Sequence, residues 1–302
     1  MPRRATHTNQ KRNMWKDASK GVKKCKARLN LRPLYRGMTM AVSVERKMVM
    51  RGAVQIEVLA QGTGPTMVLL PSLGRGAEDF DPMADVLAQA GYRVLRPQPR
   101  GIGASSPAPV YADLQDCSND IAAVIEADGN GPAIMVGHAF GNRVSRLLAT
   151  IRPDLVTGVV LVAANVGHAP SPPKVREAIR NSANPTLPDD VRLDALRFAF
   201  FAPGNDAVPW LKNWYPDVLA AQRIAGDQTA RTIDYASGNV PILYMQPSHD
   251  PLAHAEDAVE YKAALGDRLT VIKIPQSSHA AIAEQPDFIA REIAAWAKKV
   301  AR

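Results

Sequence analysis

From residue 44 onward, short runs of apolar and β-branched residues alternate with longer segments of helical periodicity. This alternation is typical of a mainly parallel sheet with helices on both faces. The predicted strands lie at residues 44–50, 54–59, 67–70, 93–96, 133–136, 158–162, 242–245 and 269–274. The predicted helices lie at residues 79–89, 112–127, 141–151, 255–265 and 286–300. We therefore expect an α/β fold with one eight-stranded, mostly parallel sheet flanked by helices.

The segment between the sixth and seventh predicted strands differs from the rest of the chain in its composition and in its hydrophobic pattern. Residues 167–238 begin with a proline-rich stretch and contain helical patterns without a convincing strand. Ligands of parallel α/β sheets bind outside the carboxyl ends of the strands, where this insertion would lie. We therefore predict a helical lid, residues 167–238, on a core of residues 43–166 and 239–302. The aromatic side chains of the lid either line an apolar pocket or form its own small core. The candidates for substrate binding are Phe201, Trp210 and Trp214.

The formal charge of +8 is concentrated at one end of the chain. Residues 1–50 carry 14 Lys and Arg against two acidic residues, whereas the rest carries 23 basic and 27 acidic residues. A mildly acidic body with a basic arm does not indicate a dedicated nucleic-acid domain. The arm, residues 1–42, is poor in apolar residues and has no periodicity, so we expect it to be disordered. We favour a solvated tail over a tether to nucleic acid or to an anionic surface.

Several other classes of protein are disfavoured by the sequence. No run approaches about 18 consecutive apolar residues, so we predict no membrane span. Arg3 and Arg4 are not followed by an apolar segment, so we expect no export signal. The two cysteines, Cys25 and Cys117, form no disulfide framework, which fits a reducing cytoplasm. No histidine has a second ligand at metal-site spacing, and we predict neither a metal nor a cofactor. The sequence does not specify an oligomeric state.

Residues 137–141 read Gly-His-Ala-Phe-Gly, between the apolar stretch 133–136 and the helical pattern 142–151. A strand, a sharp turn and a helix are the setting of the nucleophile elbow G-x-S-x-G, which carries a serine at its tip. Here the tip residue is Ala139, and a methyl group cannot attack a carbonyl. Loss of a serine nucleophile costs about 10⁶ in turnover, so efficient acyl-enzyme catalysis at Ala139 is excluded. We expect neither Ser72 nor another nearby serine to replace it, because none occupies the tip.

Other chemically informative residues follow the remaining predicted strands. A glycine-containing loop at residues 71–76 follows the third strand, and another at residues 100–105 follows the fourth. Asp250 comes just after the seventh strand and His279 just after the eighth. Because the carboxyl ends of parallel strands meet at one edge, we expect Asp250 and His279 to form a pair facing the elbow.

Together these segments resemble the α/β-hydrolase fold family, and the resemblance covers residues 44–302. The matching motifs are Leu-Leu-Pro-Ser-Leu-Gly-Arg-Gly at 69–76, Arg-Gly-x-Gly-x-Ser at 100–105, Gly-His-x-x-Gly at 137–141, His-Asp-Pro at 249–251, Ile-Pro-x-x-x-His at 274–279 and Glu-Gln-Pro-Asp-Phe at 284–288. The resemblance implies that His279 is the general base and that Asp250 orients its imidazole. It also implies an oxyanion hole formed by the backbone N–H groups of Leu73 and Phe140. The chain departs from the family pattern at Ala139, and by Pro-Ser at 71–72, where the family often has His-Gly.

Three functions are compatible with this sequence, in decreasing order of preference. In the first, His279 and Asp250 act as a general base on a small, moderately apolar organic molecule without a covalent intermediate. The reaction would be hydrolysis, or the lyase or cofactor-independent oxygenase chemistry known for this fold. In the second, alanine replaces the nucleophile of a serine esterase or related hydrolase, naturally or by engineering. In the third, the protein binds a small apolar ligand without turnover.

Overall fold

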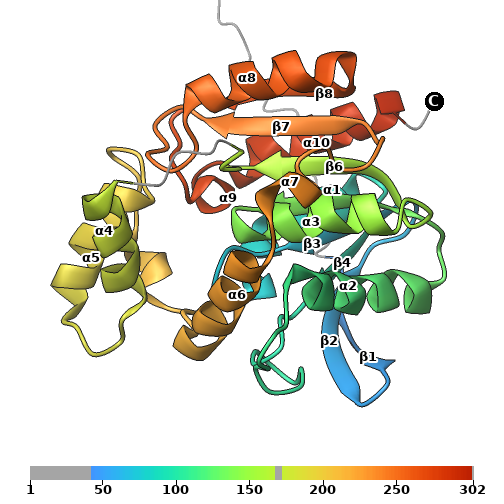
Figure 1. Cartoon of the computed structure of the whole chain (residues 1–302), viewed down its shortest axis with the longest axis horizontal. Helices are drawn as coiled ribbons and strands as arrows, with labels where there is room; N and C mark the ends of the chain where they lie inside the picture. Colours follow the sequence, from blue (N-terminus) through green and yellow to red (C-terminus); the bar gives the residue numbers. More distant parts are fainter. Residues whose placement is uncertain (1–41, 167–171, 301–302) are drawn as a thin grey trace, which may run out of the picture. The chain divides into compact units, whose positions relative to one another are not determined.

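The computed structural model describes residues 42–166 and 172–300, so residues 1–41 of the predicted arm lie outside the described part. Its centre is one eight-stranded sheet with the order β1-β2-β4-β3-β5-β6-β7-β8 (Figure 1). The strands are β1 (Glu45–Arg51), β2 (Val54–Gln61), β3 (Thr66–Leu70), β4 (Arg93–Pro97), β5 (Ala133–His138), β6 (Val156–Val162), β7 (Ile242–Pro247) and β8 (Leu269–Ile274). The eight-stranded sheet predicted from the sequence is confirmed.

The sheet is antiparallel only at its first edge. β1 and β2 form a hairpin from the pair Glu45 and Ala60 to the pair Arg51 and Val54, and β2 is also antiparallel to β4. Every other neighbouring pair is parallel. The carboxyl ends of β3 to β8 therefore meet at one edge, as the mostly parallel sheet expected from the sequence requires.

Helices cover both faces of the sheet (Figure 1). The helices outside the insertion are α1 (Asp81–Gln89), α2 (Leu114–Asp128), α3 (Phe140–Ile151), α8 (Ala255–Leu265), α9 (Ala281–Glu284) and α10 (Pro286–Val300), with short 3₁₀ turns η1 (Ala77–Phe80) and η3 (Gly266–Arg268). Figure 1 shows α2 and α3 in front of the sheet, with α1 and α10 behind it. The predicted helices are confirmed, with ends that shift by up to two residues.

The boundaries of α2 illustrate why the ends shift. The sequence predicts a start at Ala112, but Asp113 is the N-cap, and its carboxylate accepts a hydrogen bond from the Gln115 amide. An Asp in this role satisfies an N–H group that has no partner inside the helix. The helix ends at Gly129, which has a φ of 68°. Glycine adopts this left-handed conformation without the steric cost of a Cβ.

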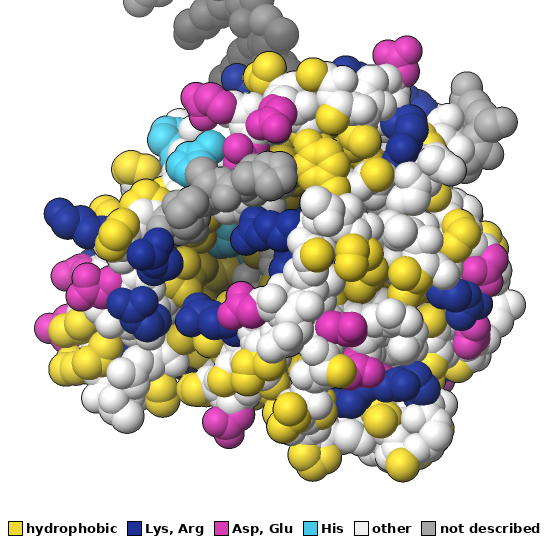
Figure 2. Space-filling model, viewed as in Figure 1, with side chains coloured by type: hydrophobic (Ala, Val, Ile, Leu, Met, Phe, Trp, Pro, Cys, Tyr) yellow, Lys and Arg dark blue, Asp and Glu magenta, His cyan; other side chains and the backbone are white. Residues whose placement is uncertain are grey.

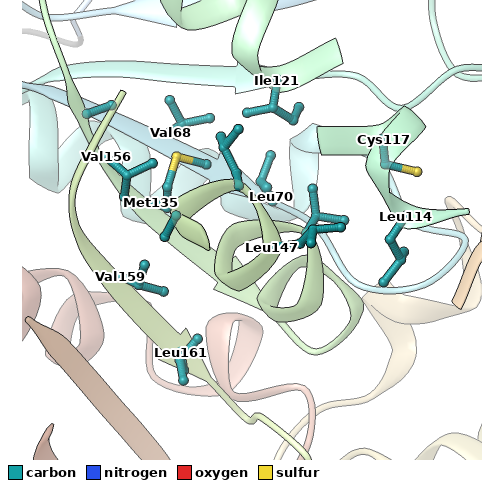
Figure 3. Close-up of a cluster of buried hydrophobic side chains, with 14 of the residues drawn as sticks. Val68, Leu70, Leu114, Cys117, Ile121, Met135, Leu147, Val156, Val159 and Leu161 are labelled. Atoms are coloured by element: carbon teal, nitrogen blue, oxygen red, sulfur yellow. The ribbon is translucent and has the colours of Figure 1, made fainter. Parts of the chain in front are cut away.

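Each central strand supplies side chains to two apolar layers. In β3, Val68 and Leu70 point to the face covered by α2 and α3, whereas Met67 and Leu69 point to the face covered by α1 and α10. Figure 3 shows the first of these layers, in which Val68 and Leu70 lie with Met135 of β5 and other buried side chains. Such strands read as continuous apolar runs because both of their faces are covered. The rigid sheet fixes the loops that follow its strands.

The insertion between β6 and β7 consists of helices. These are α4 (Pro173–Ala183), α5 (Asp189–Ala199), η2 (Val208–Leu211), α6 (Pro216–Gln228) and α7 (Arg231–Asp234). Figure 1 draws α4 and α5 beyond the arrowheads of β6 and β7. The first part has its own apolar cluster, which includes Leu196, Phe200 and Trp210. The role of this segment as a lid stays a prediction, as do the domain boundaries.

Across residues 42–166 and 172–300, no helix is both long and apolar enough to cross a bilayer.

Candidate active site

The strand β5 ends at His138, and α3 begins at Phe140, so a single residue makes the turn between them. That residue, Ala139, has a φ of 48° and a ψ of −106°. A residue with a Cβ adopts positive φ at a cost of roughly 1–3 kcal/mol, which the surrounding structure must offset. Two hydrogen bonds hold the turn: the Ala139 amide donates to the Val162 carbonyl at 3.1 Å, and the Asn142 amide donates to the Ala139 carbonyl at 3.1 Å.

Two glycines allow the helix to approach the sheet closely at this turn. A Cβ on Gly137 would lie 2.5 Å from the Asn142 nitrogen, and a Cβ on Gly141 would lie 2.3 Å from the Leu70 carbonyl oxygen. Neither distance is compatible with a side chain. The spacing of glycines around Ala139 therefore has a steric reason, which does not depend on the identity of the residue at the tip.

His279 and Asp250 form a hydrogen-bonded pair at the same edge of the sheet. His279 Nδ1 lies 2.9 Å from Asp250 Oδ2. The other carboxylate oxygen accepts the backbone amides of Leu252 at 2.7 Å and Ala253 at 3.2 Å. The Asp250 side chain is 0% exposed, and that of His279 is 8% exposed. With Nδ1–H directed at the carboxylate, neutral His279 carries its lone pair on Nε2, which is the atom required of a base.

A second histidine fixes the backbone of the first. His138 is fully buried, and its Nε2 lies 2.7 Å from the His279 carbonyl oxygen, to which it donates as the Nε2–H tautomer. Burial lowers the pKa of His138 to about 3, with further lowering by the neighbouring His279 and by Arg75. His138 is therefore neutral at physiological pH. It joins the end of β5 to the loop that carries His279.

A cavity of about 220 Å³ lies over the elbow. Its lining includes both residues expected to supply oxyanion-hole amides, Leu73 and Phe140, together with Ala139 and His279. Phe140 is the first residue of α3, so its N–H has no acceptor within the helix. The remaining lining residues are Ser72, Asn142, Arg143, Arg146, Ala163, Asn165, Ile179, Phe200, Trp214, Leu219, Arg231 and Leu252.

The loop that carries Leu73 is fixed by a buried ion pair. Arg75 makes a two-pronged interaction with Asp79, at 2.7 Å from Nε to Oδ2 and 2.6 Å from Nη2 to Oδ1. The Arg75 guanidinium also lies 4.3 Å from the ring centre of Trp210 and 4.8 Å from that of Trp214. A planar, two-pronged pair has defined geometry, which limits motion of the loop. The insertion and the loop after β3 are thereby connected.

The aromatic residues of the insertion divide between its core and the cavity. Phe201 and Trp210 are buried in the apolar cluster of the insertion, and they do not belong to the cavity lining. Trp214 lines the cavity, as does Phe200, whose ring centre lies 5.6 Å from that of His279. Phe200 is not among the substrate-binding candidates predicted from the sequence, because Phe198, Phe200 and Phe201 lie close together and their pattern does not indicate which ring turns inward.

Three arginines of the cavity wall were also missed from the sequence, namely Arg143, Arg146 and Arg231. The sequence pattern does indicate the positions of two of these arginines. Arg143 and Arg146 lie three residues apart at the start of the helix that follows the elbow, so both share one helical face close to the tip. The third arrives from α7 in the insertion, and the sequence alone does not place it.

Over residues 42–166 and 172–300, no group of three or more His, Cys, Asp or Glu side chains has the arrangement of a metal site. His168 lies outside the described residues, and Cys117 is a buried free thiol on α2.

Comparison with known proteins places this site in a family. The family model described as the alpha/beta hydrolase family matches residues 67–292, which is well over half of the chain. The chain belongs to the alpha/beta hydrolase family. The resemblance seen in the sequence motifs is thus confirmed at the level of the family. The match extends from β3 into α10 and includes the elbow, Asp250 and His279.

Individual members of the alpha/beta hydrolase family resemble this chain to different extents. The 2-(acetamidomethylene)succinate hydrolase of Mesorhizobium japonicum is 31% identical over 111 residues, which are 37% of this chain and 40% of that protein. The alignment thus spans about two fifths of that relative. BpoC of Mycobacterium tuberculosis, which carries the name of a non-heme bromoperoxidase, is 24% identical over 250 residues, or 76% of this chain and 92% of BpoC.

Solved structures of family members share the fold. The crystal structure of BpoC has a TM-score of 0.69 at 23% identity, and covers 88% of this chain and 99% of that chain. The enol-lactonase from Burkholderia xenovorans LB400 has a TM-score of 0.69 at 19% identity, and covers 83% of this chain and 100% of that chain. At these identities the likeness concerns the fold, and the reaction has to be argued from the site.

The close approach at the elbow predicts the effect of Gly141→Ala. The new Cβ would lie 2.3 Å from the Leu70 carbonyl oxygen, so backbone must move. We expect the free energy of unfolding, measured by urea denaturation, to fall by about 1–3 kcal/mol. The control is Gly226→Ala in α6, where the Cβ would come no closer than 3.3 Å to another group, the end of the Arg143 side chain. Equal stability of Gly141→Ala and wild type would contradict the close approach.

The neutral state of buried His138 predicts a pH dependence of stability. The unfolded chain binds a proton at this histidine below about pH 6.5, whereas the native state stays neutral until its folded pKa of about 3. Stability therefore falls as the pH is lowered through this window, by up to about 1.4 kcal/mol per pH unit. We expect urea denaturation at several pH values to give a smaller slope for His138→Gln. The exposed His249, changed to Gln, is the control. An unchanged slope in His138→Gln would show that His138 titrates normally.

Proposed function

We propose that this member of the alpha/beta hydrolase family is an enzyme that uses His279 as a general base, oriented by Asp250, without a covalent intermediate. The observation that carries the proposal is the hydrogen bond of 2.9 Å between His279 Nδ1 and Asp250 Oδ2, directly beside a cavity that includes Ala139. The substrate is a small, moderately apolar organic molecule, because the cavity is of small-molecule size and its wall includes Phe200, Trp214 and several aliphatic side chains.

Hydrolysis by this mechanism needs no nucleophilic side chain, because a water molecule is the attacking group. His279 Nε2 takes a proton from a water molecule, and the resulting hydroxide attacks the substrate carbonyl. The negative charge that develops on the carbonyl oxygen is accepted by the amides of Leu73 and Phe140. The intermediate then expels its leaving group, which takes the proton back from His279. Asp250 stabilises the imidazolium between these two transfers.

The methyl group of Ala139 has a defined part in this mechanism. A serine at the tip would place its hydroxyl where the attacking atom has to be, in contact with the base. With alanine, that position is open to water or to an acidic group of the substrate. Direct removal of a substrate proton by His279 would give lyase or oxygenase chemistry from the same arrangement. Hydrolysis is preferred, because relatives such as the Mesorhizobium japonicum protein are named as hydrolases.

A second function is supported by the conformation of the elbow. Ala139 has a φ of 48°, a conformation that alanine itself does not favour, and the glycines around it keep the close approach of strand and helix. This geometry suits a serine nucleophile. The alternative is therefore a serine hydrolase whose nucleophile has been replaced by alanine, with the rest of the machinery retained.

The general-base proposal predicts that His279→Ala lowers turnover by roughly 10²- to 10⁴-fold. The measurement is a screen of small esters, amides and lactones with the wild-type protein, followed by steady-state kinetics on the best substrate. The matched control is His249→Ala, since His249 is exposed and its ring interacts with the neighbouring Ser248. Unchanged turnover in His279→Ala would rule out the proposed base. Turnover by neither protein, together with saturable ligand binding, would favour the non-catalytic function.

The retained elbow predicts that Ala139→Ser gains a reactive hydroxyl. We expect a fluorophosphonate probe to label Ala139→Ser covalently and to leave wild type unlabelled, as detected by intact-mass spectrometry. The double variant Ala139→Ser/His279→Ala should label more slowly, because the base that activates the hydroxyl is absent. If Ala139→Ser folds and is not labelled, the base and the elbow tip are not aligned for nucleophilic catalysis.

A further inference from the structure

Glu284 opens the motif Glu-Gln-Pro-Asp-Phe of residues 284–288, to which the proposed mechanism gives no role. It is the last residue of α9, the short helix that follows His279, and its carboxylate turns back to the loop before the helix. Its Oε2 accepts the backbone amide of Ser278 at 2.5 Å, and Ser278 directly precedes His279. Hydrogen bonds from an amide to an ionised carboxylate are among the stronger ones in proteins. Glu284 therefore binds the backbone one residue before the proposed base.

The other oxygen of Glu284 binds the insertion. Glu284 Oε1 accepts the Ala202 amide at 2.7 Å and the side-chain nitrogen of Asn205 at 2.6 Å. Both donors lie in the segment between α5 and η2. The same nitrogen of Asn205 also donates to the Gln276 carbonyl at 2.9 Å, in the loop after β8. One carboxylate thus joins the insertion to the loop that carries His279.

The joint between the insertion and this loop lies next to the cavity over the elbow. The Ala280 amide donates to the Phe200 carbonyl at 2.7 Å, and the Phe200 ring centre lies 5.6 Å from that of His279. Phe200 and His279 line the cavity, whereas Glu284 and Asn205 do not belong to its lining. Figure 2 shows a hollow with apolar side chains at its base. Glu284 therefore acts on residues of the cavity from a position behind its wall.

The surroundings of Glu284 require a carboxylate. Within the described part of the chain, its hydrogen-bond partners are the N–H donors of Ser278, Ala202 and Asn205. Burial raises the pKa of Glu284 from its ordinary value, and the nearby Asp250 acts in the same direction, whereas these donors lower it. Removing a carboxylate from water is costly unless N–H groups replace its hydration. A carboxylate offers an acceptor at both oxygens, which a carboxamide of the same shape does not.

The bond from Ser278 to Glu284 acts on a different side of His279 from the contacts already described. Asp250 orients the imidazole, and His138 binds the carbonyl of His279, so both act at His279 itself. The amide of Ser278 belongs to the chain that leads into His279. A displacement of about 1 Å in a reacting group can cost on the order of 10² in rate. A constraint on the backbone before His279 therefore bears on catalysis without contact to the substrate.

We propose that Glu284 is a positioning residue for His279. One of its carboxylate oxygens holds the backbone before His279, and the other is anchored by Ala202 and Asn205 of the insertion. This inference rests on the proposed function for its effect on turnover. It gives the insertion a second part in the site, because the same segment that brings Phe200 to the cavity wall also holds the proposed base in its alignment with Ala139.

The kinetic test is Glu284→Gln, which keeps the shape of the side chain and replaces one oxygen by an NH₂ group. In either orientation, that group faces an N–H donor. We expect kcat to fall by roughly 10- to 100-fold and KM to stay within about threefold, because the base is displaced and no cavity-lining residue is changed. The control is Glu260→Gln, at an exposed position of α8. Unchanged kcat overturns the proposal, and a raised KM at unchanged kcat would show that Glu284 supports only the cavity wall.

Asn205→Ala tests the anchor from the side of the insertion, and it keeps the test available if thermal unfolding shows that Glu284→Gln has lost its fold. We expect this variant to lower kcat by about fivefold, since it removes one hydrogen bond to the carboxylate. In the double variant with Glu284→Gln, the loss should be smaller than the product of the two single losses, because Asn205 acts through Glu284. Unchanged kcat in Asn205→Ala, or fully multiplicative losses, would overturn the anchoring by the insertion.

A measurement without substrate separates this inference from the proposed function. In wild type labelled with ¹⁵N-histidine, the proton between His279 Nδ1 and Asp250 is assigned as the resonance that is lost in His279→Ala, and its exchange with water is measured by saturation transfer. We expect exchange to be roughly ten times faster in Glu284→Gln and unchanged in Glu260→Gln, because the imidazole leaves Asp250 more often. Equal exchange in Glu284→Gln and wild type overturns the positioning role. Faster exchange, together with turnover that does not depend on His279, keeps the positioning role and rejects the general-base mechanism.

Discussion

The close contact between the start of α3 and the carbonyl of Leu70 is the constraint on which the site depends. It exists because Gly141 has no Cβ, so the helix can begin against the end of β3. A helix that starts there directs its first amides into the space over the sheet edge, where two of the lining residues, Phe140 and Leu73, lie on adjacent elements. The absence of a side chain at Gly141 thus determines where the first amides of α3 lie, and these are the groups that could donate a hydrogen bond to a negatively charged oxygen.

A second connection joins two parts of the candidate site. His279 belongs to the loop after β8, whereas the elbow belongs to β5, and these strands are separated by β6 and β7 in the sheet. The bond from His138 Nε2 to the His279 carbonyl spans this separation within the protein interior. His138 immediately precedes the elbow tip, so the position of His279 is set by the same strand end that sets the tip. Neither element needs the absent hydroxyl to stay in place.

The sequence predicted the fold well because its signals are local. β3 is a continuous apolar run, and α10 repeats Ile289, Ile293 and Trp296 at helical spacing, so both patterns follow from burial alone. The order of the strands in the sheet was harder to predict from the sequence. The place of β4 between β2 and β3 depends on which strand edges form hydrogen bonds with each other in the folded chain. The pairing of Asp250 with His279, in contrast, could be predicted, because both residues follow parallel strands whose carboxyl ends meet at one edge of the sheet.

The wall of the cavity was less accessible for a physical reason. Arg146 is a polar residue on a helix, and such residues are mostly exposed, so its burial could not be anticipated from its type. Its environment is created by α7 and the buried Asp234, which come from a segment almost ninety residues further along the chain. The division of the aromatic residues has a similar origin, because the tertiary packing of the insertion buries Trp210 and leaves Trp214 half-buried at the cavity.

The turn at Ala139 also bears on how readily one chemistry could be exchanged for the other. Its positive φ is held by the hydrogen bond from its amide to the Val162 carbonyl and by the bond that its carbonyl accepts from the Asn142 amide, and it would cost about the same with any residue that has a Cβ. The side chain is only partly buried, so a hydroxyl there would not be an unsatisfied group in the core. The fold therefore places almost no energetic barrier between alanine and serine at this point. The proposed general-base mechanism and the serine-hydrolase alternative thus differ by a single oxygen atom at this position, at nearly constant stability.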